Sequence, residues 1–239
     1  MNKINFQKIK GNIYISISFI LCIVVIGAFI MFNKSNTNNN ISTTKLMLPS
    51  STGNISIEKT IKKRRSIREF KNIPLSSLEI SQLLWSAQGI TNKKENFRAT
   101  PSAGALYPLE IYIVCGNVQN LETGVYKYNP KKHELNSIQK GDKRNELFNA
   151  CLQQKSIQKA PASIVICAIY DKTTKKYGAR GKQYVHMEVG AASENIYLQA
   201  ISLDIGTVFI GGFENDKVQK TINSKKEEIP LCVMPLGKI

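Results

Sequence analysis

Three arginines and one serine lie within five residues of each other at positions 64 to 68. The segment reads Arg64-Arg65-Ser66-Ile67-Arg68 and directly follows a stretch with helical character. Guanidinium groups donate paired hydrogen bonds to phosphate oxygens, and a serine hydroxyl with nearby backbone N–H groups can complete such a site. The segment therefore predicts a phosphate-binding site at Arg64, Arg65, Ser66 and Arg68. On these residues alone, a solvated basic turn is the alternative.

Two turns rich in small residues are candidates for contact with a flat ligand. The first, Pro101-Ser102-Ala103-Gly104, precedes a strand-like run. Small side chains let the backbone approach a ligand closely, and glycine adopts conformations that other residues avoid. The second, Gly211-Gly212, follows a strand-like run, and open sheets commonly bind ligands beyond the carboxyl ends of their strands. Each turn by itself is equally consistent with a tight loop.

Lys176 and Tyr177 are the candidate catalytic residues, because they place two proton-transfer groups in a glycine-containing connection. A mobile basic loop is the alternative. His133 lies in a charged turn and His186 at the start of a long helical pattern, and we expect both to have structural roles. The common dinucleotide, nucleotide, zinc-protease and serine-hydrolase motifs do not occur in the sequence, which argues against those sites.

Alternating helices and strands must position these residues. Apolar periodicity and a capping box that begins at Ser76 predict helices over residues 55–63, 76–89 and 182–203. Enrichment in β-branched and aromatic residues predicts strands over residues 109–115, 124–128, 162–170, 206–210 and 229–234. The pattern predicts an α+β fold with one central mixed sheet flanked by helices.

An uncharged apolar stretch near the start of the chain predicts a membrane helix. Three lysines precede residues 11–32, and about 20 residues suffice to cross a bilayer as a helix. We therefore expect residues 1–32 to be an N-terminal transmembrane anchor with the domain outside the cytoplasm. A cleaved signal segment is the alternative. Residues 33–53, rich in Asn, Ser and Thr, are expected to form a flexible linker, which leaves residues 54–239 as one domain.

The composition is that of an ordinary globular chain. Hydrophobic residues make up 42% of the sequence and charged residues 21%, which excludes disordered and collagen-like classes. The net charge of +16 is scattered along the chain and accompanies an excess of Lys, Ile and Asn, so we expect no nucleic-acid partner. The cysteines lack the paired spacing of a zinc site or a disulfide framework, so we expect them to be buried and expect no metal centre.

Taken in order, the motifs between residues 55 and 238 resemble the flavin-dependent nitroreductase family, and within it the SagB-type dehydrogenases. Any one motif could occur by chance, but the ordered set is specific. The resemblance rests on Arg-Arg-Ser-Ile-Arg-Glu-Phe at 64–70, Leu-Leu-Trp-Ser-Ala-Gln-Gly-Ile-Thr at 83–91, Pro-Ser-Ala-Gly-Ala-Leu-Tyr-Pro-Leu-Glu at 101–110, Gly-Val-Tyr-Lys-Tyr at 124–128, Lys-Tyr-Gly-Ala-Arg-Gly at 176–181, His-Met-Glu-Val-Gly at 186–190, Asn-Ile-Tyr-Leu-Gln-Ala at 195–200 and Pro-Leu-Gly-Lys at 235–238.

The resemblance implies a homodimer that binds FMN at its subunit interface. Such a protein transfers hydride between a donor, expected to be NAD(P)H, and an oxidised substrate. By the family pattern, the residues that would hold the FMN phosphate and ribityl chain are Arg64, Arg65, Ser66, Arg68 and Lys238.

The same pattern assigns roles around the flavin ring. The residues that would line the isoalloxazine are Pro101, Ser102, Ala103 and Gly104. The turn Gly211-Gly212 would present a backbone N–H to the flavin N5 atom. Lys176 and Tyr177 coincide with a pair that would remove a proton in the azoline-oxidising branch.

Three functions are consistent with these observations. The first is an FMN-dependent oxidoreductase that acts on an unknown small molecule. The second is a SagB-type dehydrogenase that oxidises thiazoline or oxazoline rings in a peptide. Against the second, Ala191 and Glu194 stand where members commonly have His and Gln. The third is a non-enzymatic binding domain tethered to a membrane.

Overall fold

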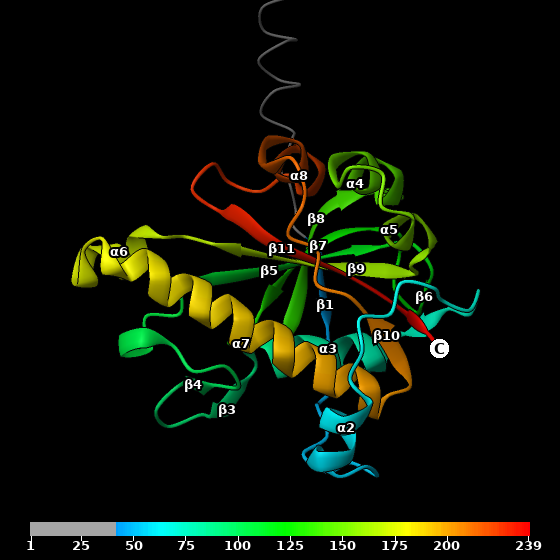
Figure 1. The fold of residues 1–239 in the computed structure, drawn as a ribbon, viewed down its shortest axis with the longest axis horizontal. Helices are drawn as coiled ribbons and strands as arrows, with labels where there is room; N and C mark the ends of the chain where they lie inside the picture. The colour runs from blue at the N-terminus through cyan, green and yellow to red at the C-terminus, as the bar shows by residue number, and fades with distance from the viewer. Residues whose placement is uncertain (1–41) are drawn as a thin grey trace, which may run out of the picture. The chain divides into compact units, whose positions relative to one another are not determined.

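The computed structural model describes residues 42–239, whose fold is shown in Figure 1. A seven-stranded sheet lies at the centre of this part of the chain. Its strands are β1 (Thr43–Lys45), β5 (Leu109–Cys115), β7 (Gly124–Asn129), β8 (Glu134–Lys140), β9 (Ala162–Ala168), β10 (Ile205–Thr207) and β11 (Ile229–Lys238). They are arranged in the order β1-β8-β7-β5-β9-β11-β10. The remaining strands form two short pairs, β2 (Leu75–Ser76) with β6 (Val118–Gln119) and β3 (Ile90–Asn92) with β4 (Phe97–Arg98).

The central sheet is antiparallel, which corrects the expected mixed sheet. Within residues 42–239, every pair of neighbouring strands in it is antiparallel. β9 and β10 run in the same direction, as a helical connection between two strands predicts. However, the C-terminal strand β11 lies between them and pairs antiparallel with both. The late position of β11 in the sequence gives no indication of this insertion.

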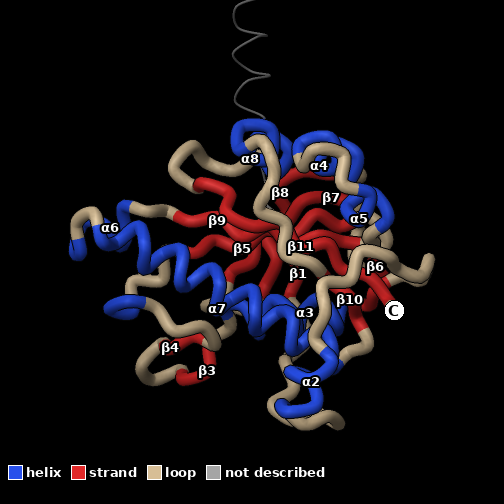
Figure 2. Tube along the Cα trace, viewed as in Figure 1, coloured by secondary structure: helices blue, strands red, loops and turns tan. Residues whose placement is uncertain are grey.

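Helices cover both faces of the sheet (Figures 1 and 2). They are α2 (Ile57–Lys63), α3 (Ser77–Gln88), α4 (Arg144–Ala150), α5 (Lys155–Lys159), α6 (Asp171–Tyr177), α7 (Arg180–Ser202) and α8 (Asn215–Ile222), with a short 3₁₀ turn, η1, over Ala103–Ala105. The predicted capping box is confirmed: the Glu79 amide donates to Ser76 Oγ at 3.2 Å, and the Ser76 amide donates to Glu79 Oε2 at 2.8 Å. The reciprocal bonds satisfy two free donors at the start of α3.

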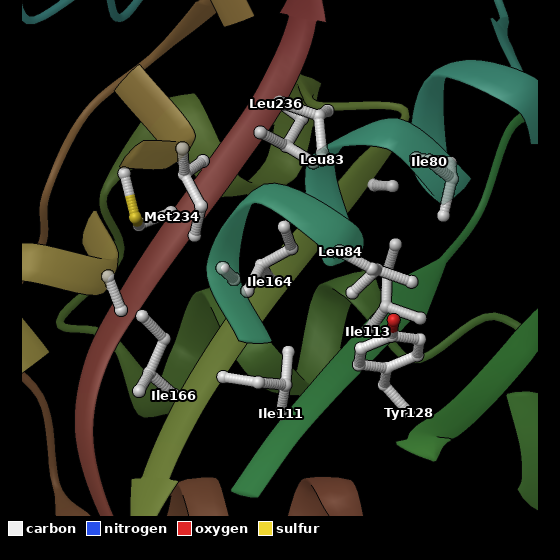
Figure 3. Close-up of a cluster of buried hydrophobic side chains, with 14 of the residues drawn as sticks. Ile80, Leu83, Leu84, Ile111, Ile113, Tyr128, Ile164, Ile166, Met234 and Leu236 are labelled. Atoms are coloured by element: carbon white, nitrogen blue, oxygen red, sulfur yellow. The ribbon is translucent and has the colours of Figure 1, made fainter. Parts of the chain in front are cut away.

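The core has two layers because the strands bury side chains on both faces. On one face α3 and α7 pack against the sheet, and Figure 3 shows Leu83 and Leu84 of α3 with Ile111 of β5. On the other face α4, α5 and α8 cover Tyr112 and Val114 of the same strand. Alternate residues of β5 therefore enter opposite layers, and for this reason the strand reads as a continuous apolar run. The cysteines of the described residues are buried and free, as expected.

Part of the segment predicted as a flexible linker pairs with the sheet. β1 lies within residues 33–53 and forms an antiparallel pair with β8. Leu46 is buried, and the His133 ring lies 2.9 Å from the carbonyl oxygen of Met47 and 2.8 Å from the Tyr128 hydroxyl. The composition of the segment did not indicate this, because an open sheet edge offers backbone hydrogen bonds to almost any sequence. His133 has the structural role that we expected.

The expectation of a membrane-bound protein is corrected. Within residues 42–239, no helix is both long and apolar enough to cross a bilayer. The longest, α7, carries charged residues along its length, including Arg180, Glu188 and Glu194. The segment on which the expectation rested, residues 1–32, lies outside the described residues.

Candidate active site

Tyr197 of α7 joins the basic segment to β10. Ser66 forms a parallel bridge with Thr207, and the Ile67 amide donates to the Thr207 carbonyl oxygen at 2.9 Å. This pairing directs the chain past α7, where Ser66 Oγ lies 3.2 Å from the Tyr197 hydroxyl. The Arg64 guanidinium lies over the same ring, 5.1 Å from its centroid. A buried tyrosine therefore fixes the positions of two predicted phosphate ligands.

The same hydroxyl also contacts the segment that leads to the glycine turn. The Phe209 amide donates to Tyr197 Oη at 2.6 Å. Two residues further on, Gly211 and Gly212 are exposed, and neither amide donates a hydrogen bond to any described residue. The structure thus links Arg64 and Ser66 to this turn through one side chain. Sequence reasoning had not assigned a role to Tyr197, although it lies in one of the motifs that carry the family resemblance.

The other predicted phosphate ligands are placed differently. Arg65 turns back on α2, and its Nη1 donates to the carbonyl oxygens of Lys62 at 3.2 Å and Arg64 at 2.6 Å. Arg68 is exposed. Lys238 pairs with Glu79 and donates to the Leu203 carbonyl oxygen at 3.1 Å. The structure therefore brings Arg64 and Ser66 together, whereas the Arg65 and Lys238 side chains contact other groups.

The loop from Ser102 to Tyr107 has a strained backbone. Gly104, Ala105 and Tyr107 have φ values of +61°, +53° and +47°. The Tyr107 amide donates to Ser102 Oγ at 2.9 Å, and the Arg98 guanidinium lies 4.4 Å from the centre of the Tyr107 ring. Non-glycine residues in this region of φ cost of order 1–3 kcal/mol each and persist only where the surroundings hold them, often at functional sites.

This loop lies against the two predicted catalytic residues. A Cβ atom placed on Gly104 would lie 2.7 Å from the Tyr177 hydroxyl and 3.0 Å from Lys176 Nζ. The Lys176 ammonium lies 5.4 Å from the centre of the Tyr177 ring. Lys176 is exposed and Tyr177 is half-buried, so both groups are accessible to a ligand on the loop. Two motifs more than 70 residues apart in sequence thus form one site.

Ion pairs attach α6, the helix that ends at the two predicted catalytic residues, to the sheet. Lys172, one turn before Lys176, lies 2.6 Å from a Glu110 carboxylate oxygen, and Lys127 lies 3.0 Å from the other oxygen. Lys127 also pairs at 2.6 Å with Glu228, which is 1% exposed. Burial alone would raise the pKa of Glu110. The hydrogen bond from Lys172 and the charge of Lys127 outweigh this effect and lower the pKa. An ionised Glu110 therefore fixes α6, and with it Lys176, on β5.

A buried acid lies beneath the loop and was not singled out from the sequence. Glu188 of α7 is 4% exposed. Burial raises its pKa to about 7, against the opposing effects of the Ser102 hydroxyl and the Arg98 charge. Its place in the polar stretch of α7 resembles that of a surface residue, because the sequence alone does not show which turn of the helix the loop covers.

The two groups of residues lie along one helix. Glu188 adjoins the Gly104 loop, and Tyr197 adjoins Arg64 and Ser66. Nine residues separate these positions on α7, or about 13.5 Å at a rise of 1.5 Å per residue. A small-residue loop beside a proton-transfer pair at one end, and a guanidinium with a hydroxyl at the other, suit an elongated ligand with a flat head and an anionic tail.

A hollow of about 940 Å³ in the described part of the chain does not coincide with this site. It lies between α2, α3, α7 and residues 48–55, and Ala99 and Asn195 are at one edge. Asn195 Nδ2 donates to Thr100 Oγ1 at 3.2 Å, and Thr100 lies two residues before the loop from Ser102 to Tyr107. The hollow therefore adjoins the site without containing the predicted residues. Exposed apolar side chains also line it, namely Leu48, Ile57 and Leu78.

Comparison with protein families places most of the described chain in one group. The model of the nitroreductase family matches residues 61–238. A Methanocaldococcus jannaschii protein described as a nitroreductase is 44% identical over 184 residues, which are 77% of this chain and 91% of the relative. The Escherichia coli microcin B17-processing protein McbC is 28% identical over 172 residues, which are 69% of this chain and 63% of McbC. This chain thus spans less than two thirds of McbC.

Solved structures share the fold. A crystal structure from Anabaena variabilis, described as a nitroreductase, has a TM-score of 0.73 and 30% identity, and the match covers 83% of this chain and 42% of that one. A chain of the E. coli microcin synthetase McbBCD complex with truncated pro-MccB17 has a TM-score of 0.64 and 27% identity. That match covers 80% of this chain and 75% of the other.

Proposed function

The chain belongs to the nitroreductase family, and from this premise we propose that it is an FMN-dependent oxidoreductase with NAD(P)H as hydride donor. The observation that carries the proposal is the packing of the Gly104 loop against Lys176 and Tyr177. A glycine-containing loop packed beside two proton-transfer groups is an arrangement suited to a flat redox ligand and a substrate stacked on it. Its strain supports a functional role rather than a role in packing.

The residues present fit FMN at both ends. Arg64 and Ser66 would hold the phosphate, since a guanidinium and a hydroxyl both donate to phosphate oxygens. Pro101, Ser102, Ala103 and Gly104 offer a surface of small residues to the ring. The backbone N–H groups of Gly211 and Gly212 are exposed and donate to no described residue, so they are available to an acceptor on the same ligand. Arg68 is exposed and free to contribute charge, whereas Arg65 and Lys238 would have to leave their present partners.

When bound, FMN would supply hydride transfer, and the protein supplies binding, orientation and proton transfer. The Glu110 ion pairs hold α6 so that Lys176 and Tyr177 face the Gly104 loop. In this arrangement the Tyr177 hydroxyl gives a proton to the substrate or accepts one from it. The Lys176 ammonium stabilises negative charge on the Tyr177 oxygen.

The absorption spectrum of the purified full-length chain, followed by identification of any small molecule released by heat, tests this function. We expect one FMN per chain and bleaching of the visible bands on addition of NADH or NADPH. A colourless protein that also takes up no added FMN would contradict the proposal and favour a non-enzymatic binding domain. Turnover is then measured with a nitroaromatic compound and a quinone as oxidised substrates.

A second candidate is oxidation of azoline rings in a peptide. The similarity to McbC, together with the Lys176-Tyr177 pair, favours this candidate. Ala191 and Glu194 depart from the pattern of that branch, and Glu194 lies 4.0 Å from Arg64, at the phosphate end of the site. Incubation of the FMN-loaded chain with a thiazoline-containing peptide distinguishes the candidates, because each oxidised ring lowers the peptide mass by about two hydrogens.

We also expect the chain to form a homodimer, as the family resemblance implies. The hollow between α3 and α7 is bordered by Leu48, Ile57 and Leu78, whose exposed fractions are 85%, 54% and 50%. Exposed apolar side chains of this size around one hollow are typical of a surface that a partner covers. Sedimentation of the wild type against Leu78→Asp tests this expectation, since a charge at this position should favour the monomer.

A further inference from the structure

The buried Glu188 carboxyl is not used by the proposed mechanism, and its surroundings are unusual. Its Oε1 atom has no hydrogen-bond partner among the described residues. The neighbouring Gln88 side chain of α3 is 1% exposed, and its Nε2 atom likewise has no partner there. Leaving a buried polar atom unpaired is costly, so two such atoms in one place call for an explanation beyond packing.

Each polar element around Glu188 presents a group that favours the ionised carboxylate. The Gln88 amide comes from α3, the Arg98 guanidinium from β4, the Ser102 hydroxyl from the loop and the Lys172 ammonium from α6. The sheet beneath α7 contributes apolar side chains, and Glu110 of β5 also attracts the Arg98 charge. Burial opposes these groups and is the largest effect, so the pKa is raised to about 7. The carboxyl is therefore close to changing charge at neutral pH.

The groups that face Glu188 also hold the strained loop. Arg98 lies against the Tyr107 ring, and its backbone amide donates to the Tyr107 hydroxyl at 3.3 Å. Arg98 Nη1 donates in turn to Gln88 Oε1 at 2.9 Å. Ser102 Oγ accepts a hydrogen bond from the Tyr107 backbone amide. A change of charge on Glu188 thus acts on the two side chains, Arg98 and Ser102, that keep Tyr107 at positive φ.

We infer that Glu188 is a positioning residue whose charge sets the conformation of the Ser102–Tyr107 loop and, through Gly104, the packing of that loop against Tyr177. The ionised carboxylate attracts the Arg98 guanidinium and is favoured by the nearby Ser102 hydroxyl, and so holds the loop in the observed form. Protonation weakens both interactions, and Ala105 and Tyr107 can then relax toward ordinary backbone angles. The consequence for catalysis rests on the proposed function, whereas the effect on the loop does not.

Fluorine NMR of the full-length chain labelled with 3-fluorotyrosine tests the effect on the loop directly. The Tyr177 resonance is assigned with Tyr177→Phe and followed from pH 5 to pH 8. We expect it to shift with a midpoint near pH 7 in the wild type and to lose this shift in Glu188→Gln. The matched control is Glu122→Gln, whose carboxylate is exposed and lies 3.7 Å from an exposed lysine, Lys140. It should retain the wild-type titration.

Two results would overturn the inference: a Tyr177 resonance that does not titrate in the wild type, or an unchanged titration in Glu188→Gln. If Glu188→Gln does not fold, Ser102→Ala provides the test at a half-buried position. Loss of the Ser102 hydroxyl, which favours the ionised carboxylate, should move the midpoint to higher pH. An unchanged midpoint in folded Ser102→Ala would count against Glu188 as the titrating group.

Activity measurements separate this inference from the proposed function. With the FMN-loaded wild type, we expect kcat for quinone reduction to fall below pH 7 in parallel with the Tyr177 shift. The same pH dependence should be absent in Glu188→Gln, with KM for NAD(P)H unchanged. A chain that binds no FMN but shows the Glu188-dependent shift refutes the function and supports the inference. An active FMN enzyme whose Tyr177 resonance is the same in the wild type and in Glu188→Gln supports the function and refutes the inference.

Discussion

Gly104 and Tyr177 approach each other so closely that a side chain at position 104 would displace the Tyr177 hydroxyl. A Cβ atom there would lie 2.7 Å from the Tyr177 hydroxyl, and the glycine has a φ of +61°. Both constraints favour glycine, one through space and the other through backbone conformation. Because the two residues belong to different motifs, their contact is the point at which the loop and the proposed catalytic pair, Lys176 and Tyr177, form one site.

Replacement of Gly104 by alanine separates these two constraints when it is compared with Gly141→Ala. Gly141 has a φ of +88°, and a Cβ atom at this position would have no atom within 4 Å, so its replacement adds backbone strain alone. Both variants should lose about 1–2 kcal/mol of unfolding free energy. Only Gly104→Ala should also displace Tyr177, and we expect its turnover to fall roughly 10- to 100-fold. Urea unfolding and steady-state kinetics measure the two effects. Equal turnover in both variants would contradict the contact.

Arg64 and Arg65 should differ in their effects on flavin retention despite being adjacent. If Arg64 holds the FMN phosphate as proposed, Arg64→Ala would remove a charge-assisted hydrogen bond worth about 1.5–3 kcal/mol, or roughly a 10- to 100-fold increase in Kd. Arg65 donates to carbonyl oxygens at the end of α2, so Arg65→Ala should weaken FMN binding less and destabilise the helix end instead. Quenching of flavin fluorescence on titration with apoprotein gives both Kd values. A larger effect at Arg65 would reverse the assignment.

The fold was predictable from the sequence to the extent that local patterns determined it. The capping box at Ser76 and the β-branched runs gave α3 and the strands β5, β7 and β9 with small errors at their ends. The strand β8 and the helices α5, α6 and α8 were not predicted, and Lys176 and Tyr177 lie at the end of α6 rather than in the expected connection. The antiparallel pairing of β11 between β9 and β10 was not predictable, because pairing partners depend on contacts distant in sequence. The pairing of β1 with β8 was missed for the same reason.

The site was predictable as a set of motifs but not as a geometry. Gly104, Lys176 and Tyr177 were selected by residue type and by resemblance, and their contact emerged only in three dimensions. Tyr197 and Glu188 escaped notice because a tyrosine and a glutamate on a long helix look like ordinary core and surface residues. Their roles depend on which segments, Ser66 or Ser102, pack against that turn of α7.

Tyr197→Phe tests the connection between the basic segment and the glycine turn. The ring, and with it the contact with Arg64, is retained, but the Phe209 amide and the Ser66 hydroxyl lose their partner. A buried donor left without an acceptor costs about 1–3 kcal/mol, which we expect to measure by urea unfolding together with weaker FMN binding. Ser66→Ala is the control, since it keeps the Phe209 bond and should be less destabilising. Equal losses in the two variants would place the effect elsewhere.

Glu188 should make the stability of the fold depend on pH between its two pKa values. Its pKa is about 7 in the folded protein and 4.5 as an isolated group. Between these values the unfolded chain has released the proton and the folded chain retains it, so stability falls as pH rises and levels off above pH 7. The shift corresponds to a loss of about 3 kcal/mol in free energy of unfolding.

Urea unfolding at pH 5, 6, 7 and 8 should show this decline in the wild type and in Glu122→Gln. The free energy of unfolding of Glu188→Gln should lack this decline, so that it increases relative to that of the wild type as pH rises. Parallel stability curves for the wild type and Glu188→Gln would show that the carboxyl is ionised throughout, which the burial of its side chain makes unfavourable.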